Sequence, residues 1–255
     1  MFKNLSKKEI SWIFYDWANS AYTMVVTSTI MSLYFLSSAG AALSGRVADP
    51  AVTANAYWGF ANSAATLVLV VLSPILGTMA DYKGRKKKMF QFFLFTGVVF
   101  TAILAFVPSN QWLLLLIVYV ITAIGFSGSN IFYDAFLVDV SEDKNMDRVS
   151  SLGFALGYIG STIPFILCMV LVVLDTLEVI PLSLEMSYKI SFIITALWWI
   201  GFSIPMIKDV HQIYGIEPEA HYVRKSFQRL GTTLREIRKH RHIFTFLLAY
   251  FFYID

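Results

Sequence analysis

The stretch that decides the fold runs from residue 77 to residue 89 and reads GTMADYKGRKKKM. It joins two apolar runs, Ala54–Ala80 and Met89–Val107. Each run has about the 20 residues, or more, that a helix needs to cross a bilayer. A connection this short makes its two helices antiparallel neighbours. The stretch therefore predicts a hairpin of membrane helices with a positively charged turn.

The overall composition is that of a membrane protein. Of the 255 residues, 57% are hydrophobic and 15% are charged, whereas soluble domains average about 45–50% and about 25%. A soluble domain of this size could not bury so much apolar surface. The apolar content excludes a disordered chain, and the single cysteine, Cys168, excludes a disulfide scaffold.

Several apolar runs are long enough to span a membrane. The six complete runs are Ser11–Leu36, Ala54–Ala80, Met89–Val107, Trp112–Val140, Leu152–Leu174 and Ser187–Ile207. A seventh run begins at Ile243 and is too short to cross by Asp255. We therefore expect a six-helix transmembrane bundle at residues 1–207, a cytoplasmic linker at 208–242 and the start of a truncated seventh helix at 243–255. A helix that stops inside lipid leaves backbone groups unpaired, so the sequence predicts a longer protein.

The basic residues predict the orientation. Of the 20 Lys and Arg residues, 18 fall in the N-terminus, the second and fourth loops and the linker, and 2 fall in the alternate segments. The positive-inside rule places the N-terminus in the cytoplasm. We expect an integral protein of the plasma (inner) membrane. A cleaved signal peptide is not expected, because the first apolar run is too long and contains Asp16.

The linker carries one apolar stripe. Its members recur at spacings of four, three, four and three residues: Val223, Phe227, Leu230, Leu234 and Ile237. Arg and Lys fill much of the remaining surface, which is typical of an amphipathic helix that lies on an anionic membrane. A solvated linker helix and a nucleic-acid-binding helix are the alternatives, and we expect the membrane-surface helix.

Two spans carry polar side chains that share a helical face. Asp16 and Asn19 lie three residues apart in the first span, and Asn130 and Asp134 lie four apart in the fourth, beside Tyr133. Ionisable groups inside a span are expensive and normally face the bundle interior. We expect these five residues to line one cavity that binds a substrate or a proton. The alternative is structural, with each Asp accepting hydrogen bonds that fix helix packing.

The quoted stretch resembles the signature loop of the major facilitator superfamily, Gly-x-Leu-Ala-Asp-Arg-x-Gly-Arg-[Arg/Lys]. The positions that match, apart from Ala80, are the ones we expect to form a gate: Gly77, Asp81, Gly84, Arg85 and Lys86. Tyr82 replaces the usual basic residue. Gly77 would let another helix approach closely, and Gly84 would allow the turn. Asp139, near the exit of the fourth span, is expected to join this gate by pairing with Arg85 or Arg148.

Enzyme and metal motifs are absent from the sequence. There is no His-Glu-x-x-His pair and no phosphate-binding loop, and Gly125-Phe-Ser127-Gly-Ser129 lacks the last Gly of a nucleophile elbow. All four His residues fall in the linker. We therefore expect no enzyme, no cofactor and no metal site. Gly153, Gly157 and Gly160 in the fifth span predict close helix packing.

Three further segments resemble one family. FYDWANSAY at residues 14–22, FYDAFL at 132–137 and LGYIGS at 156–161 are similar to the unknown-major-facilitator family, which includes the autophagy-related vacuolar amino-acid effluxers. YFFYID at 250–255 resembles the start of its seventh span. The resemblance implies an all-α twelve-span facilitator fold with two six-helix halves and a site between them.

The expected function follows from this resemblance. It implies a secondary transporter that moves a small solute, amino acids among the candidates, by alternating access. The expected partners are that solute, the lipid bilayer and the C-terminal half of the same protein, without nucleic acid. The alternative is a membrane scaffold or regulatory half-transporter that does not itself transport.

Overall fold

The computed structural model describes residues 4–217 and, beyond them, positions 227–228, 231–232, 242, 244–246 and 249. The described residues form helices and contain no β-strand, which confirms the all-α fold class. The α-helices are α1 (Lys7–Ala21), α2 (Met31–Leu43), α3 (Pro50–Ala80), α4 (Lys86–Leu104), α5 (Trp112–Ala135), α6 (Leu137–Val140), α7 (Asp143–Thr176) and α8 (Leu184–Asp209). A π-helix, η1 (Tyr22–Ile30), joins α1 to α2.

Six helices of the described part are long and apolar enough to cross a membrane. The first is the continuous helix Lys7–Leu43, made of α1, η1 and α2, and the others are α3, α4, α5, α7 and α8. The six predicted spans are therefore confirmed, and the protein is an integral membrane protein. The predicted linker helix and seventh span lie almost wholly outside the described residues.

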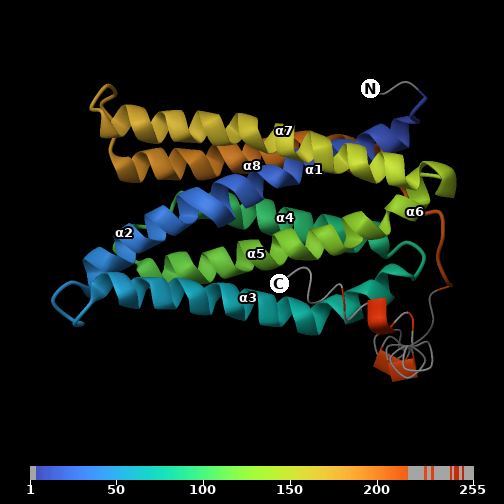
Figure 1. Ribbon diagram of the computed structural model, residues 1–255, viewed down its shortest axis with the longest axis horizontal. Helices are drawn as coiled ribbons and strands as arrows, with labels where there is room; N and C mark the ends of the chain where they lie inside the picture. The colour runs from blue at the N-terminus through green and yellow to red at the C-terminus, as the bar shows by residue number, and fades with distance from the viewer. Residues whose placement is uncertain are drawn as a thin grey trace.

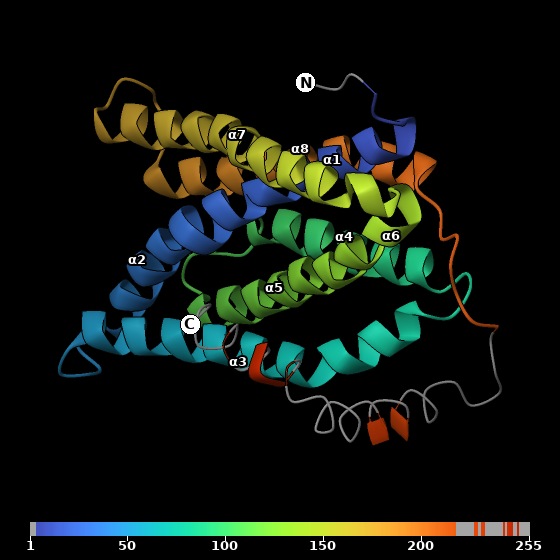
Figure 2. The ribbon, with the colours of Figure 1, turned by 45° about the vertical axis from the view of Figure 1, so that its right-hand side comes forward.

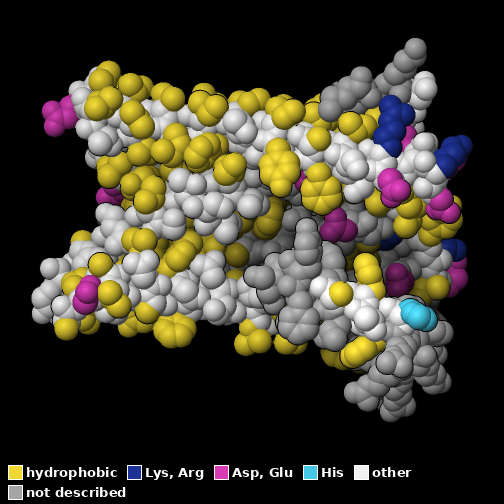
Figure 3. All heavy atoms as spheres, in the orientation of Figure 1, with side chains coloured by type: hydrophobic (Ala, Val, Ile, Leu, Met, Phe, Trp, Pro, Cys, Tyr) yellow, Lys and Arg dark blue, Asp and Glu magenta, His cyan; other side chains and the backbone are white. Residues whose placement is uncertain are grey.

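The helices form a bundle in which the first span is central. Figures 1 and 2 show α7 and α8 on one side of this span and α3, α4 and α5 on the other. α1 packs against α7 and α8, whereas α2 packs against α3. The α3–α4 loop, α6 and the end of α8 lie at the same end of the bundle as the N-terminus (Figure 1). Lys and Arg gather at this end on the face in Figure 3. We call it the basic end.

The helices extend beyond the spans that hydropathy outlines. α1 begins at Lys7 rather than Ser11, because Ser6 and Glu9 form a capping box at its start. α3 begins at Pro50, where the Asp49 side chain accepts a hydrogen bond from the backbone N–H of Val52. Hydropathy marks where side chains become apolar, while caps mark where the backbone hydrogen bonds begin.

The sequence suggested that the fourth span is one helix as far as Val140, and this prediction was wrong. α5 ends at Ala135, and Leu137–Val140 form the separate turn α6. The first span also departs from a plain helix, because its nine residues Tyr22–Ile30 are π-helical. π-helical segments are rare and occur often at functional sites. Hydropathy does not reveal either feature.

Glycines allow the first span and α7 to touch. A methyl group on Gly160 would lie 2.7 Å from the backbone carbonyl oxygen of Trp17, and one on Gly157 would lie 2.7 Å from Ser20 Oγ. The predicted packing role of these glycines is thus confirmed. A second close crossing was not predicted: a methyl group on Gly125 of α5 would lie 2.4 Å from the backbone nitrogen of Gly97 in α4.

Gly160→Ala tests the α1–α7 contact. The added methyl has no room against the Trp17 backbone, and overpacking of this kind costs about 1–3 kcal/mol. We expect a lower thermal unfolding midpoint for the full-length protein in detergent. Gly201→Ala in α8 is the matched control, because nothing lies within 4 Å of the added methyl. Equal midpoints for the two variants would contradict the assigned contact.

Candidate functional site

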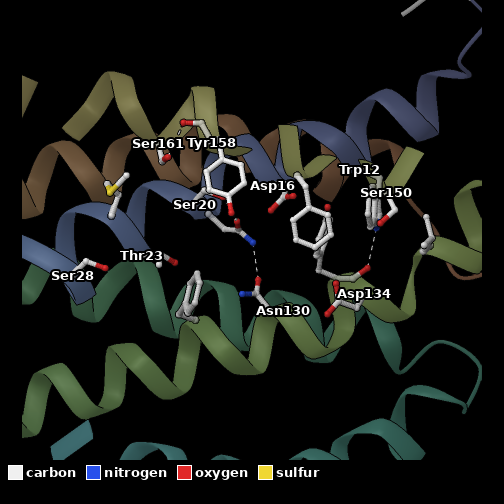
Figure 4. Close-up of a pocket in the computed structure, with 16 residues that line it drawn as sticks. Trp12, Asp16, Ser20, Thr23, Ser28, Asn130, Asp134, Ser150, Tyr158 and Ser161 are labelled. Atoms are coloured by element: carbon white, nitrogen blue, oxygen red, sulfur yellow. Dashed lines mark hydrogen bonds between the residues drawn. The ribbon is translucent and has the colours of Figure 1, made fainter. Parts of the chain in front are cut away.

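A cavity of about 410 Å³ with both polar and apolar lining residues opens between the first span, α5 and α7 (Figure 4). It is lined by all five residues that the sequence singled out as a binding site, namely Asp16, Asn19, Asn130, Tyr133 and Asp134. The structure therefore brings these residues together, although their role is untested. The helical spacing placed each set on one face, and side-chain contacts between α1 and α5 bring the two faces together.

Hydrogen bonds hold the first span to α5 along the cavity. Asn19 Nδ2 donates to Asn130 Oδ1 over 2.7 Å, the bond drawn in Figure 4. The indole N–H of Trp12 donates to the backbone carbonyl oxygen of Tyr133 over 2.9 Å. The rings of Trp12 and Tyr133 also stack, with their centroids 4.3 Å apart. These contacts fix the two helices in register.

The two carboxylates take no part in this network. Asp16 lies half-buried on α1, and Asp134 is exposed at the cavity on α5. Neither forms an ion pair in the described part of the chain, and no Lys, Arg or His lines the cavity. The helix contact is made by amide, indole and backbone groups, which leaves the carboxylates available to other groups.

The glycines of α7 make room for Asp16. A methyl group on Gly153 would lie 3.3 Å from Asp16 Oδ2 and 3.3 Å from the Tyr133 hydroxyl. One on Gly157 would lie 3.3 Å from Asp16 Cγ. The Gly-x-x-x-Gly spacing that signals packing therefore also shapes the cavity wall.

Several lining residues were not anticipated. Those on α7 are Ser150, Phe154, Tyr158 and Ser161, and those on the first span are Trp12, Ser20, Met24 and Ser28. The α7 residues lie at spacings of four, four and three, so one helical face carries them beside the glycines. That spacing is the sequence signal from which this face of α7 could have been predicted to line the cavity. Thr23, Met24 and Ser28 belong to η1, so the π-helical segment borders the cavity.

A second polar cluster lies at the basic end. Lys86 Nζ forms a buried ion pair with Asp139 Oδ2 over 2.6 Å and also donates to the backbone carbonyl oxygen of Ala135. The ion pair joins α4 to α6. We expected Asp139 to pair with Arg85 or Arg148; the ion pair in the structure is with Lys86, because the first residue of α4 is buried against the end of α5.

Residues 210–217, which we call the strap, follow α8 across this cluster. Asp139 Oδ1 accepts hydrogen bonds from the backbone N–H groups of Ile213 and Tyr214, over 2.7 and 2.9 Å. The backbone N–H of Ile216 donates to the carbonyl oxygen of Asp81, and the N–H of Lys83 donates to the carbonyl oxygen of Ile216. Asp139 and the α3–α4 loop are thus tied to the same segment.

Of the two glycine predictions for this loop, the one for Gly84 is confirmed and the one for Gly77 is not. Gly84 has a φ of +71°, so it supplies the left-handed turn that the sequence predicted. No described residue lies within 4 Å of a methyl group placed on Gly77, so no helix of the described part makes the expected close approach. The gating role of Gly77, Asp81, Gly84, Arg85, Lys86 and Asp139 stays a prediction.

Comparison with known proteins decides the family. The family model described as "Vacuole effluxer Atg22 like" matches residues 5–255. The chain belongs to this family. It is also 54% identical over all 255 residues to the "Uncharacterized MFS-type transporter YxiO" of Bacillus subtilis (strain 168), and it spans 58% of that relative's length. No solved structure matches the chain.

Membership of the Atg22-like family agrees with the six membrane helices and with the resemblance drawn from the sequence. The segments FYDWANSAY and FYDAFL, which carried that resemblance, supply the five predicted residues of the cavity except Asn130, which lies two residues before the second segment. The segments on which the resemblance was drawn therefore supply residues of the cavity in the first span and α5.

Asp139→Asn tests the buried ion pair. The amide oxygen of the substituted side chain can still accept from the strap, but the Lys86 ammonium loses its counter-charge, and breaking a buried pair costs about 3–5 kcal/mol. We expect a lower unfolding midpoint for the full-length protein, and partial recovery when Lys86→Met is added. Lys144→Met, which breaks an exposed ion pair with Glu142, should change little. A single variant as stable as the wild type would refute the assignment.

Proposed function

We propose that this chain is the N-terminal half of a secondary transporter that moves a small solute, with amino acids the first candidates, by alternating access. The observation that carries the proposal is the cavity, where polar residues from two distant segments converge beside two carboxylates without ion-pair partners among the described residues. Ionisable residues in a membrane helix are costly and normally serve a pathway for a solute or a proton.

The arrangement of the cavity favours binding over a purely structural role. Structural carboxylates would accept the hydrogen bonds that join the first span to α5. Those bonds are instead made by Asn19, Asn130 and Trp12. Asp16 and Asp134 therefore have acceptor capacity for a substrate or a proton.

The basic end supports the alternating-access part of the proposal. Lys86 and Asp139 form an ion pair beside the α3–α4 loop, and the strap binds both the loop and Asp139. Interfaces of this kind have discrete arrangements, so they suit a latch that holds one conformation. The second half of the pathway would come from a C-terminal segment that corresponds to the part of the relative that this chain does not match.

The proposed location is the plasma (inner) membrane with the N-terminus in the cytoplasm. The asymmetry of 18 against 2 basic residues between alternate segments supports this orientation. The structure gathers the N-terminus, the α3–α4 loop and the end of α8 at one end, as a single cytoplasmic face requires (Figure 1).

Asp16→Asn tests the proposal. In the full-length protein reconstituted into proteoliposomes, we expect it to abolish concentrative transport, so that the accumulation ratio falls to about one, while the protein still folds. The reason is that the amide cannot exchange a proton or balance a charge as a carboxylate does. Asp147→Asn, on an exposed position of α7 outside the cavity, is the charge-matched control. Unchanged accumulation by Asp16→Asn would rule out a coupling role.

A further inference from the structure

The cavity carries charge of one sign only. Its lining includes the carboxylates of Asp16 and Asp134 and contains no Lys, Arg or His from the described part of the chain. Clefts lined by one sign of charge between low-dielectric walls concentrate ions of the opposite sign. The wall supplied by this half is therefore built for a cation.

The carboxylates of this cavity differ from three acidic residues that pack elsewhere in the bundle. Asp139 forms an ion pair with Lys86, Glu185 with Lys189 and Asp209 with Lys7. Asp16 and Asp134 are not among the described ion pairs, although both lie within membrane-length helices. Asp16 is half-buried and Asp134 is exposed at the cavity, and both lie in a cleft between apolar helices, where opposite charges attract more strongly than in bulk water. A cation that enters this cavity therefore gains an interaction that no Lys, Arg or His of the lining supplies.

The hydroxyl of Tyr133 points independently to a ligand. Tyr133 is 4% exposed, lines the cavity, and its hydroxyl has no hydrogen-bond partner among the described residues. It approaches the same point on α7 as Asp16 Oδ2, since both oxygens would lie 3.3 Å from a methyl group on Gly153. A buried hydroxyl without a partner costs about 1–3 kcal/mol. A ligand group bound at Asp16 would provide that partner.

The aromatic residues of the lining favour an organic cation over a metal ion. Trp12, Phe154 and Tyr158 bring aromatic rings to the same cavity, and ring faces attract organic ammonium groups. The volume of about 410 Å³ fits the range of small-molecule sites. Among the described residues, no group of three or more His, Cys, Asp or Glu is placed to hold a metal ion. An organic ammonium group can both pair with the carboxylates and lie against the faces of the aromatic rings.

We propose that this half binds the ammonium end of the solute, with Asp16 and Asp134 as counter-charges, the Tyr133 hydroxyl as an acceptor and the aromatic wall around it. This inference rests on the proposed function and adds to it which end of the solute this half of the transporter binds. A carboxylate on the same solute would lie away from this wall, because the described wall offers no cation to bind it.

The test separates the ammonium from the rest of the solute. Four compounds share each carbon skeleton: an amino acid, its amide, the acid without the amino group, and the amide without the amino group. Sets built on the side chains of alanine, leucine and phenylalanine cover different sizes. Their binding to the purified full-length protein is measured by titration calorimetry, and transport of the amino acids, sugars and carboxylic acids is measured in proteoliposomes.

We expect the two members that carry an ammonium to bind in at least one set, and the two that lack it to bind at least tenfold more weakly. Asp16→Asn and Asp134→Asn should each weaken the ammonium members by about tenfold, equivalent to about 1.4 kcal/mol. Tyr133→Phe should weaken them less, because it removes one neutral hydrogen bond. Asp147→Asn, outside the cavity, should leave every affinity unchanged.

The outcomes keep this inference apart from the proposed function. If the protein transports sugars or carboxylic acids while the ammonium members do not bind, the proposed function holds and this inference is wrong. Equal binding of all four members, or ammonium binding that neither Asp variant weakens, would also overturn it. If nothing is bound or transported, both proposals fail.

Discussion

The bundle depends on how the first span is held between two different kinds of contact. On one side the glycines of α7 let the helices approach until a methyl on Gly160 would meet the Trp17 backbone. On the other, hydrogen bonds such as Asn19 to Asn130 join it to α5. Lipid offers no hydrophobic force between helices, so close packing and polar contacts must supply the association. Because neutral groups make these contacts, the carboxylates of Asp16 and Asp134 are left for the cavity.

The cavity and the basic end belong to the same helices. α5 carries Asn130 and Asp134 into the cavity and then ends beside the buried Lys86–Asp139 ion pair. α8 continues into the strap, which hydrogen-bonds to Asp139 and to the α3–α4 loop. A change in the angle of α5 would therefore alter both the cavity lining and the contacts around the Lys86–Asp139 ion pair. This is the physical link that a solute-dependent gate requires, since coupling needs an element with two arrangements that both sites bias.

The sequence predicted most of the fold because the bilayer imposes it. Six apolar runs and the distribution of basic residues were enough to give the spans and their antiparallel order. The expectation that α3 and α4 are close neighbours was wrong, because α3 packs mainly against α5 and α2. The five cavity residues followed from helical spacing in two spans. Hydropathy could not show the π-helical Tyr22–Ile30, the break after Ala135 or the partner of Asp139, because each depends on local backbone geometry or on side-chain direction. The α7 wall was missed because its glycines were read as packing alone.

Access to the cavity from both sides of the membrane tests the central claim most directly. Thr23 lines the cavity, is exposed there, and would accept a cysteine in full-length protein that lacks other reactive thiols. A membrane-impermeant maleimide is then applied to inside-out and right-side-out vesicles, with and without solute. The account predicts labelling from both sides, with solute changing the balance. Labelling from one side only, unaffected by any transported solute, would contradict alternating access at this cavity.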